Sequence, residues 1–170
     1  MTPPQPKTLA TRLRAVCAVR LLPLLALLAV PAAVQAQFNF TTNSGAITIT
    51  GYTGDGGDVT IPSSTNGYPV TSIGNSAFID CFSVTNVTIP TSVTNIDVQA
   101  FTACGLTSVT IPDSVISIGQ SAFLDCSSLA SLAIGNSVIS IGDDAFYDCT
   151  SLTNIIIPKS VTNINGTAFS

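Results

Sequence analysis

The chain has 170 residues, of which 46% are hydrophobic, and contains nine acidic residues, five basic residues and no histidine. After residue 36, only Lys159 remains against nine aspartates, a net charge of about −8, and there is no arginine. One cation cannot neutralise a row of phosphates, so we exclude nucleic acid and anionic membrane surfaces as partners. Without histidine, the chain also lacks the usual general base and the commonest nitrogen metal ligand. We therefore expect no catalysis, no cofactor and no metal site.

The first 36 residues have the organisation of a secretory signal peptide. Basic residues precede an apolar run at 21–30, and the small residues Val34 and Ala36 precede an expected cleavage after Ala36. The apolar run is too short to cross a bilayer, which requires about 20 residues. We predict a secreted or cell-surface protein whose mature chain, 37–170, has no transmembrane helix. An uncleaved membrane anchor is the alternative.

Residues 37–58 are predicted to form an N-terminal β cap. The stretches AITITGY (46–52) and DVTI (58–61) have the composition of two strands, and a glycine-rich turn joins them. We expect a hairpin-like arrangement that covers the apolar face of the first repeat. The GDGGD stretch within this segment weakly resembles a calcium-binding repeat, but a single copy favours a turn.

Residues 59–170 consist of a repeat of about 23 residues. Its phase is marked by phenylalanines spaced 22 or 23 residues apart, namely Phe78, Phe101, Phe123, Phe146 and Phe169. Four full units span 70–92, 93–114, 115–137 and 138–160, with partial units at 59–69 and 161–170. One unit cannot bury its own apolar face, so we expect a solenoid in which each unit stacks on the next. The partial last unit favours a chain that belongs to a longer array.

Each unit contains the elements of one circuit of such a solenoid. The isoleucines of LTNIIIP (152–158) alternate as in a half-buried strand, which the proline ends. The stretch SVTNI (160–164) predicts a second short extended piece with Val161 and Ile164 turned inward. The apolar spacing within AFYDC (145–149) predicts one short helical turn that faces the core.

The pattern L-x-x-[IV]-x-I-P-x-S-V-x-x-I-x-x-x-A-F-x-x-C is matched in four units and resembles the BspA-like class of leucine-rich repeats. The resemblance covers 60–170 and implies a β-rich solenoid of stacked coils, with short parallel-ladder strands and one short helical turn in each coil. Proteins of this class are often surface-exposed and implicated in adhesion. The resemblance therefore implies a protein-binding or adhesion module with an extracellular partner from a host, a matrix or a neighbouring cell. A purely structural segment of a larger surface array is the alternative.

Stacking predicts that equivalent residues form ladders through the core. The phenylalanines form one such ladder, and a second is formed by the cysteines that follow them at a constant spacing, Cys81, Cys104, Cys126 and Cys149. The Cα–Cβ bonds of equivalent residues in a ladder point in parallel directions instead of converging, which disfavours a disulfide. We predict buried thiols, although disulfide pairing and a metal or catalytic role remain as alternatives.

Two sets of surface residues are candidates for binding. Asp80, Asp125 and Asp148 each precede a repeat cysteine and would suit calcium, but Ala103 interrupts the row, which favours a solvated corner. The other set is the outward face of the main strand, which is small, polar and nearly uncharged. Its residues are Asn86, Thr88, Ser108, Thr110, Ser131, Ala133, Asn154 and Ile156. Plain solvent-facing β surface is the alternative for this second set.

Overall fold

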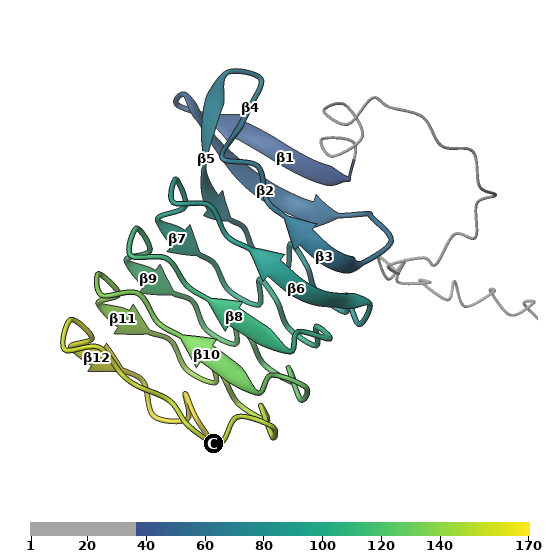
Figure 1. Ribbon diagram of the computed structural model, residues 1–170. Helices are drawn as coiled ribbons and strands as arrows, with labels where there is room; N and C mark the ends of the chain where they lie inside the picture. Colours follow the sequence, from purple (N-terminus) through teal and green to yellow (C-terminus); the bar gives the residue numbers. More distant parts are fainter. Residues whose placement is uncertain (1–36) are drawn as a thin grey trace, which may run out of the picture.

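The computed structural model describes residues 37–170, and the predicted signal peptide at 1–36 lies outside the described residues. Two sheets form two walls of a solenoid (Figure 1). The first sheet contains β1 (Phe38–Asn43), β2 (Ala46–Tyr52), β5 (Tyr68–Ile73), β7 (Asn95–Ile96), β9 (Ser117–Ile118), β11 (Ser140–Ile141) and β12 (Asn163–Ile164), with β4 (Ser64–Thr65) paired to β5. The second sheet contains β3 (Gly57–Thr60), β6 (Val84–Thr88), β8 (Ser108–Thr110) and β10 (Ser131–Ala133). The predicted leucine-rich-repeat solenoid is thereby confirmed.

The repeat sets the strand register. In the first sheet, Ile73 pairs with Ile96, which pairs with Ile118, and the series continues to Ile141 and Ile164. All these pairings are parallel and place each residue beside its counterpart one unit away. Because side chains alternate between the two faces of a strand, this register gives each sheet one uniformly apolar inner face.

The third side of the solenoid consists of consecutive β-turns, and the predicted helical turn is wrong. No helix occurs within residues 37–170. Cys81 N–H donates within the turn to Phe78 O at 3.2 Å, whereas Phe78 N–H donates to Ala100 O of the next unit at 2.8 Å. Ser76 and Asp80 have positive φ angles of 55° and 59°, which a right-handed helix does not contain. The spacing therefore identified the inward residues correctly but assigned them the wrong backbone conformation.

The N-terminal hairpin is formed by β1 and β2, not by the two stretches predicted to pair. Ser44 and Gly45 both have positive φ, as the two central residues of a type I′ hairpin turn require. This turn brings β1 antiparallel to β2. β2 then pairs in parallel with β5, while β3 pairs in parallel with β6. The glycine-rich segment after β2 therefore connects the two sheets, and the cap extends both of them.

Residues 152–158 do not form the predicted strand. Ile155 and Ile157 pack against the core, as their alternation predicts, but are only partly buried. In the described part of the chain, no backbone hydrogen bond joins this segment to β10. No described segment packs on its outer side, so fewer contacts between units hold its side chains in the core. Ile164, also expected to point inward, is 45% exposed for the same reason.

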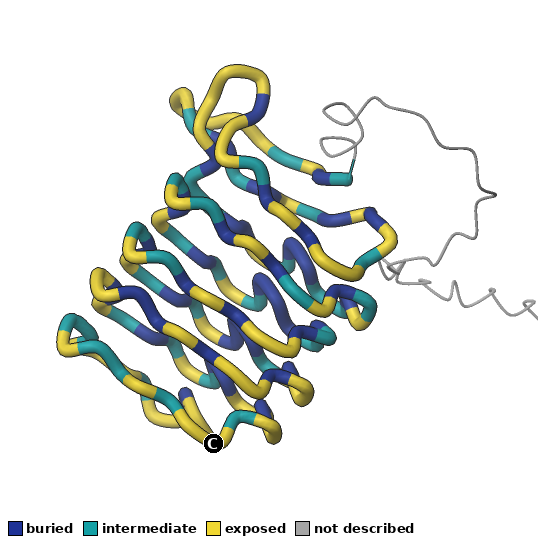
Figure 2. Tube along the Cα trace, in the orientation of Figure 1, coloured by how far each residue is buried: buried dark blue, intermediate teal, exposed yellow. Residues whose placement is uncertain are grey.

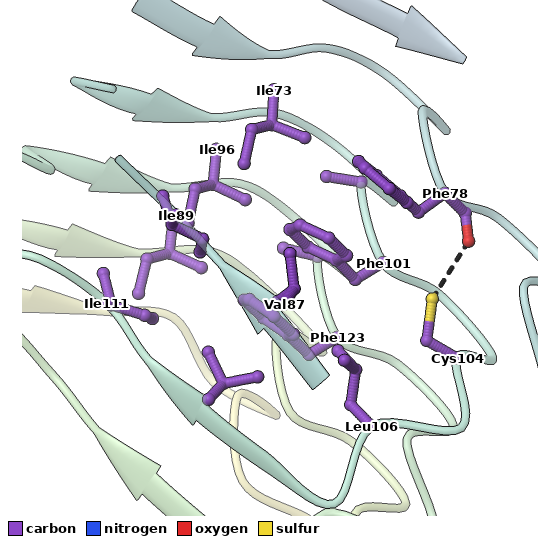
Figure 3. Packing of buried hydrophobic residues seen from close by; sticks show 14 of the residues in the cluster. Ile73, Phe78, Val87, Ile89, Ile96, Phe101, Cys104, Leu106, Ile111 and Phe123 are labelled. Carbon is purple, nitrogen blue, oxygen red and sulfur yellow. Dashed lines mark hydrogen bonds between the residues drawn. The ribbon is translucent and has the colours of Figure 1, made fainter. Parts of the chain in front are cut away.

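Phe78, Phe101 and Phe123 lie one after another in the core (Figure 3), and Figure 2 shows that buried segments recur in the coils of the solenoid. Phe78, Phe101, Phe123 and Phe146 are buried, and neighbouring rings stack with centroids 4.8–5.1 Å apart. Phe169 continues the stack at 5.2 Å from Phe146 but is 37% exposed. The stack therefore runs through every full repeat unit.

The cysteine column lies beside this stack, and all four repeat cysteines are buried. Cys104 donates its thiol hydrogen to Phe78 O at 3.0 Å, as Figure 3 shows. Cys126 and Cys149 make the same contact with the phenylalanine carbonyl of the unit that precedes each of them, Phe101 O and Phe123 O. No disulfide joins the repeat cysteines within residues 37–170. These three thiols thus add a second hydrogen bond to carbonyls that already accept a main-chain N–H within their own turn.

Candidate binding surface

The outward face of the second sheet presents two parallel rows of small side chains. The inward residues of β6, β8 and β10 are Val87, Val109 and Leu132, and the residues on either side of them point to solvent. The rows are Asp58, Asn86, Ser108, Ser131 and, beside them, Thr60, Thr88, Thr110, Ala133. The structure therefore brings six of the eight predicted surface residues into one continuous array.

The two rows differ in how far their polar groups are already engaged. Asn86 donates to Asp58 Oδ1 at 2.7 Å and accepts a hydrogen bond from Ser108 Oγ at 3.1 Å. The hydroxyl groups of Thr88 and Thr110 make no side-chain hydrogen bond to residues 37–170. The threonine row therefore keeps its donors and acceptors available to a partner, whereas Asn86 mainly ties neighbouring units together.

Asn154 and Ile156 do not join this array. They belong to residues 152–158, which have no ladder to β10, and Ile156 is 84% exposed. The sequence interpretation also omitted Asp58 and Thr60, which extend the rows toward the N-terminus. The separation between Pro62 and Pro90, one repeat plus a five-residue insertion, would have placed both residues in register.

A groove of about 380 Å³ separates β10 from residues 152–158. Its apolar walls are formed by Leu132, Ala133, Ile134, Ile155, Ile156 and Pro158. Asn136 and Asn154 supply its polar groups, and no charged residue among 37–170 lines it. This groove is therefore a mainly apolar concave surface on the outward side of the second sheet.

The aspartate row lies on the turn side of the solenoid. Asp80, Ala103, Asp125 and Asp148 all have φ between 55° and 59°. Aspartate tolerates this left-handed conformation better than most residues, which explains its recurrence at this position without a ligand. The row borders a hollow of about 610 Å³ that also includes Phe82, which is 70% exposed. Within residues 37–170, no group of three or more acidic or cysteine side chains is arranged to hold a metal ion.

Burial controls the chemistry of the thiols. It raises the pKa of Cys126 from its ordinary value of 9.0 to about 12, and that of Cys149 from 9.0 to about 11. Both shifts are due mainly to desolvation, which disfavours the thiolate. They are partly offset by hydrogen bonding from the backbone of the preceding repeat cysteine, Cys104 for Cys126 and Cys126 for Cys149, which favours the thiolate. Since the thiolate is the nucleophile and the metal ligand, these two thiols are unreactive near neutral pH.

The parallel ladders, the circuit of about 23 residues and the stacked apolar columns define a leucine-rich-repeat solenoid. The family model described as BspA type Leucine rich repeat region matches residues 58–170 in six copies, and the chain belongs to this family. No helix within residues 37–170 is long and apolar enough to cross a membrane.

Solved structures of bacterial leucine-rich-repeat proteins share this fold. The T. pallidum protein TpLRR is 36% identical with a TM-score of 0.74, over 76% of this chain and 62% of its own. A protein from Bacteroides ovatus shows 22% identity and a TM-score of 0.60, over 78% of this chain and 48% of its own. A Bacteroides capillosus protein shows 33% identity and a TM-score of 0.51, over 76% and 83%. The chain thus spans less than two thirds of the first two proteins. A search of curated proteins found no match.

Proposed function

We propose that the mature chain is a non-catalytic protein-binding module that is displayed outside the cell. The observation that carries this proposal is the pair of outward rows on the second sheet, which are continuous from β3 to β10 and contain one charged residue, Asp58. Solenoids commonly bind partners on such extended surfaces. The threonine row offers hydroxyl groups that make no side-chain hydrogen bond within residues 37–170, and the signal-peptide pattern before residue 37 supports an extracellular location.

The partner expected on this surface is an extracellular protein with a flat, largely uncharged patch. Host proteins, matrix proteins and the surface of a neighbouring cell all offer such patches, and adhesion would follow from binding to any of them. A highly basic partner would instead be drawn to the aspartate row on the turn side. The role as an adhesion module therefore rests on the outward rows, not on the net charge.

The test uses the mature chain, 37–170, immobilised and exposed to purified extracellular matrix proteins and to intact host cells. We expect saturable binding that falls at least tenfold when Thr88→Arg and Thr110→Arg are combined, because two long cations would disrupt the uncharged face. Thr162→Arg changes another exposed threonine, outside this face, and is the control that should bind normally. If neither matrix proteins nor cells bind, the chain is a structural segment of an array, and the proposal fails.

A further inference from the structure

We propose that the open edge of β10 accepts an extended, uncharged peptide segment of a partner protein, which adds to the second sheet as a parallel strand. This site is the groove beside Leu132 and Ile134; it shares Ala133 with the outward rows but lies at the edge of the sheet, where those rows end. The inference goes beyond the proposed function, and either can fail without the other.

The main chain of β10 supplies the first argument. Ala133 O accepts a hydrogen bond from Ile111 N–H at 2.8 Å, so the polar groups of Ala133 face β8. Because these groups alternate in direction along a strand, those of Leu132 and Ile134 point away from β8, toward the groove. Within residues 37–170, neither has a backbone hydrogen bond on that side. Unpaired groups on a strand edge are a template for another strand.

The opposite wall of the groove is anchored at both ends. Before it, the hydroxyl groups of Thr150 and Ser151 donate to Ser127 O at 3.4 and 2.6 Å. After it, Thr162 N–H donates to Ile139 O at 3.0 Å. Residues 152–158 are therefore fixed where they enter and leave the groove and are detached from β10 between those points. The open edge is thus a defined slot, with β10 on one side and Ile155 and Ile156 on the other.

The lining specifies the chemistry of the occupant. The walls are aliphatic and no charged side chain of residues 37–170 lines them, so a charged residue in the slot would be desolvated without a counter-charge from this part of the chain. An extended peptide with aliphatic side chains at alternate positions satisfies both the apolar walls and the unpaired main-chain groups. The direction follows from the ladder, since β3, β6, β8 and β10 are all parallel. A small apolar ligand would fill the volume but leave the main-chain groups unsatisfied.

Hydrogen exchange of the mature chain, followed by NMR, tests the open edge directly. The amides of Leu132 and Ile134 should exchange much faster than the amide of Val109, which faces β10 from within the ladder. Equal protection of these amides in a monomer would mean that residues 152–158 already close the edge, and it would overturn the proposal. Equal protection in a dimer, identified by sedimentation velocity, would make a second copy the occupant and would also overturn it.

The binding test uses a capped, fluorescent hexapeptide, Thr-Asn-Ile-Ile-Ile-Pro, which copies residues 153–158. We expect saturable binding and slower exchange of the Leu132 and Ile134 amides in the complex. Two singly N-methylated versions, at consecutive isoleucines, separate strand addition from apolar contact. Only alternate N–H groups of an added strand face β10, so one version should lose at least tenfold in affinity and the other should not. Equal affinity of the two versions, or no binding of the parent peptide, contradicts the proposal.

A protein variant provides an independent control. Ile156→Asp places a carboxylate at the mouth of the groove, on a side chain that contributes little to the core, and should reduce peptide affinity at least tenfold. Ile139→Asp makes the same change at a residue that is 49% exposed and does not line the groove. It should leave the affinity unchanged. Loss of binding in both variants would indicate a general effect of charge and would overturn the assignment to this groove.

Discussion

The units 115–137 and 138–160 begin with nearly the same sequence, VISIGQSAF and VISIGDDAF, yet their second halves differ in structure. The first halves form equivalent strands, β9 and β11, and bury Phe123 and Phe146 almost equally, at 0% and 2% exposure. The second half of the earlier unit forms β10, whereas that of the later unit, residues 152–158, forms no strand. The two halves of the later unit differ in what covers them.

Residues 161–170 cover the first half of unit 138–160. β12 pairs with β11 and Phe169 stacks on Phe146, but no described segment covers residues 152–158 on their outer side. A strand pattern thus orients side chains inward on its own, but it does not ensure that a ladder forms: the covered first half pairs with its neighbours, and the uncovered second half does not. Stability in this fold belongs to the contacts between units rather than to the units themselves.

The largest contrast is expected along the phenylalanine stack. Phe123→Ala should lower the free energy of unfolding by about 3–5 kcal/mol, because it leaves a cavity between two rings. Phe169→Ala, at the partly exposed outer position, should cost only about 1 kcal/mol. Urea denaturation of the mature chain followed by circular dichroism measures both. If Phe123→Ala does not fold, Phe123→Leu replaces it. Equal losses at the two positions would contradict the comparison.

Leu129 and Leu152 occupy the same position in units 115–137 and 138–160, so substituting them compares how much the second half of each unit contributes to stability. Leu129, before β10, is fully buried, whereas Leu152 is only partly buried. Leu129→Ala should destabilise the protein by about 2–5 kcal/mol and Leu152→Ala by about 1 kcal/mol. The same denaturation measurement applies. A cost for Leu152→Ala as large as that for Leu129→Ala would show that residues 152–158 pack more tightly in solution than in the structure.

The same two units also differ in how the ionisation of their cysteines, Cys126 and Cys149, makes the free energy of unfolding depend on pH. Because burial raises the pKa of Cys126 to about 12 in the folded state, folded and unfolded thiols are both protonated below the ordinary value of 9.0, and stability is unaffected there. Between 9.0 and about 12, the unfolded thiol ionises while the folded one does not, so the free energy of unfolding falls. For Cys149 the window is narrower, from 9.0 to about 11.

We therefore expect a lower urea midpoint at about pH 10.5 than at about pH 8, with a weaker dependence in Cys126→Val, which cannot ionise. In the native protein, iodoacetamide should modify Cys149 before Cys126, as read by mass spectrometry. Faster modification of Cys126 would contradict the order of burial. In denaturant without reductant, the mature chain should show four reactive thiols. A smaller count would favour the disulfide alternative.

Much of this arrangement could be predicted from the repeat alone. The period placed Phe123 and Cys126 in buried columns and Thr88 and Thr110 on an outward face, because a stacked repeat keeps each position in the same environment. The period could not show which segments would be covered on both sides. The alternation in residues 152–158 is therefore real, but the predicted strand does not form.

Two other features had no clear signal in the repeat pattern. The turn conformation at Asp125 depends on a positive φ, and aspartate shares that position with Ala103, so composition did not reveal it. β1 contains phenylalanine but little alternation, so the partner of β2 was assigned to β3. The turn at Asp125 is held by a hydrogen bond from its N–H to Tyr147 O of the next unit, whereas the local turn at Ser44 and Gly45 sets β1 against β2.

The smallest effect on stability is expected when calcium is added. Asp125 and Asp148, which lie in the same two units, are the candidate ligands. Calcium requires six to eight oxygen ligands, and Ala103 separates these two carboxylates from Asp80. Adding about 1 mM calcium, the range of weak extracellular sites, should therefore change the melting temperature by less than about 1 °C.

Ala103→Asp completes the row and is the matched variant. If the row is only a solvated corner, Ala103→Asp should respond to calcium no more than the parent, because turn residues pointing to solvent do not converge on one ion. A rise of several degrees in the parent protein would restore the calcium alternative, and a rise in Ala103→Asp alone would show that this single gap is what prevents the row from binding.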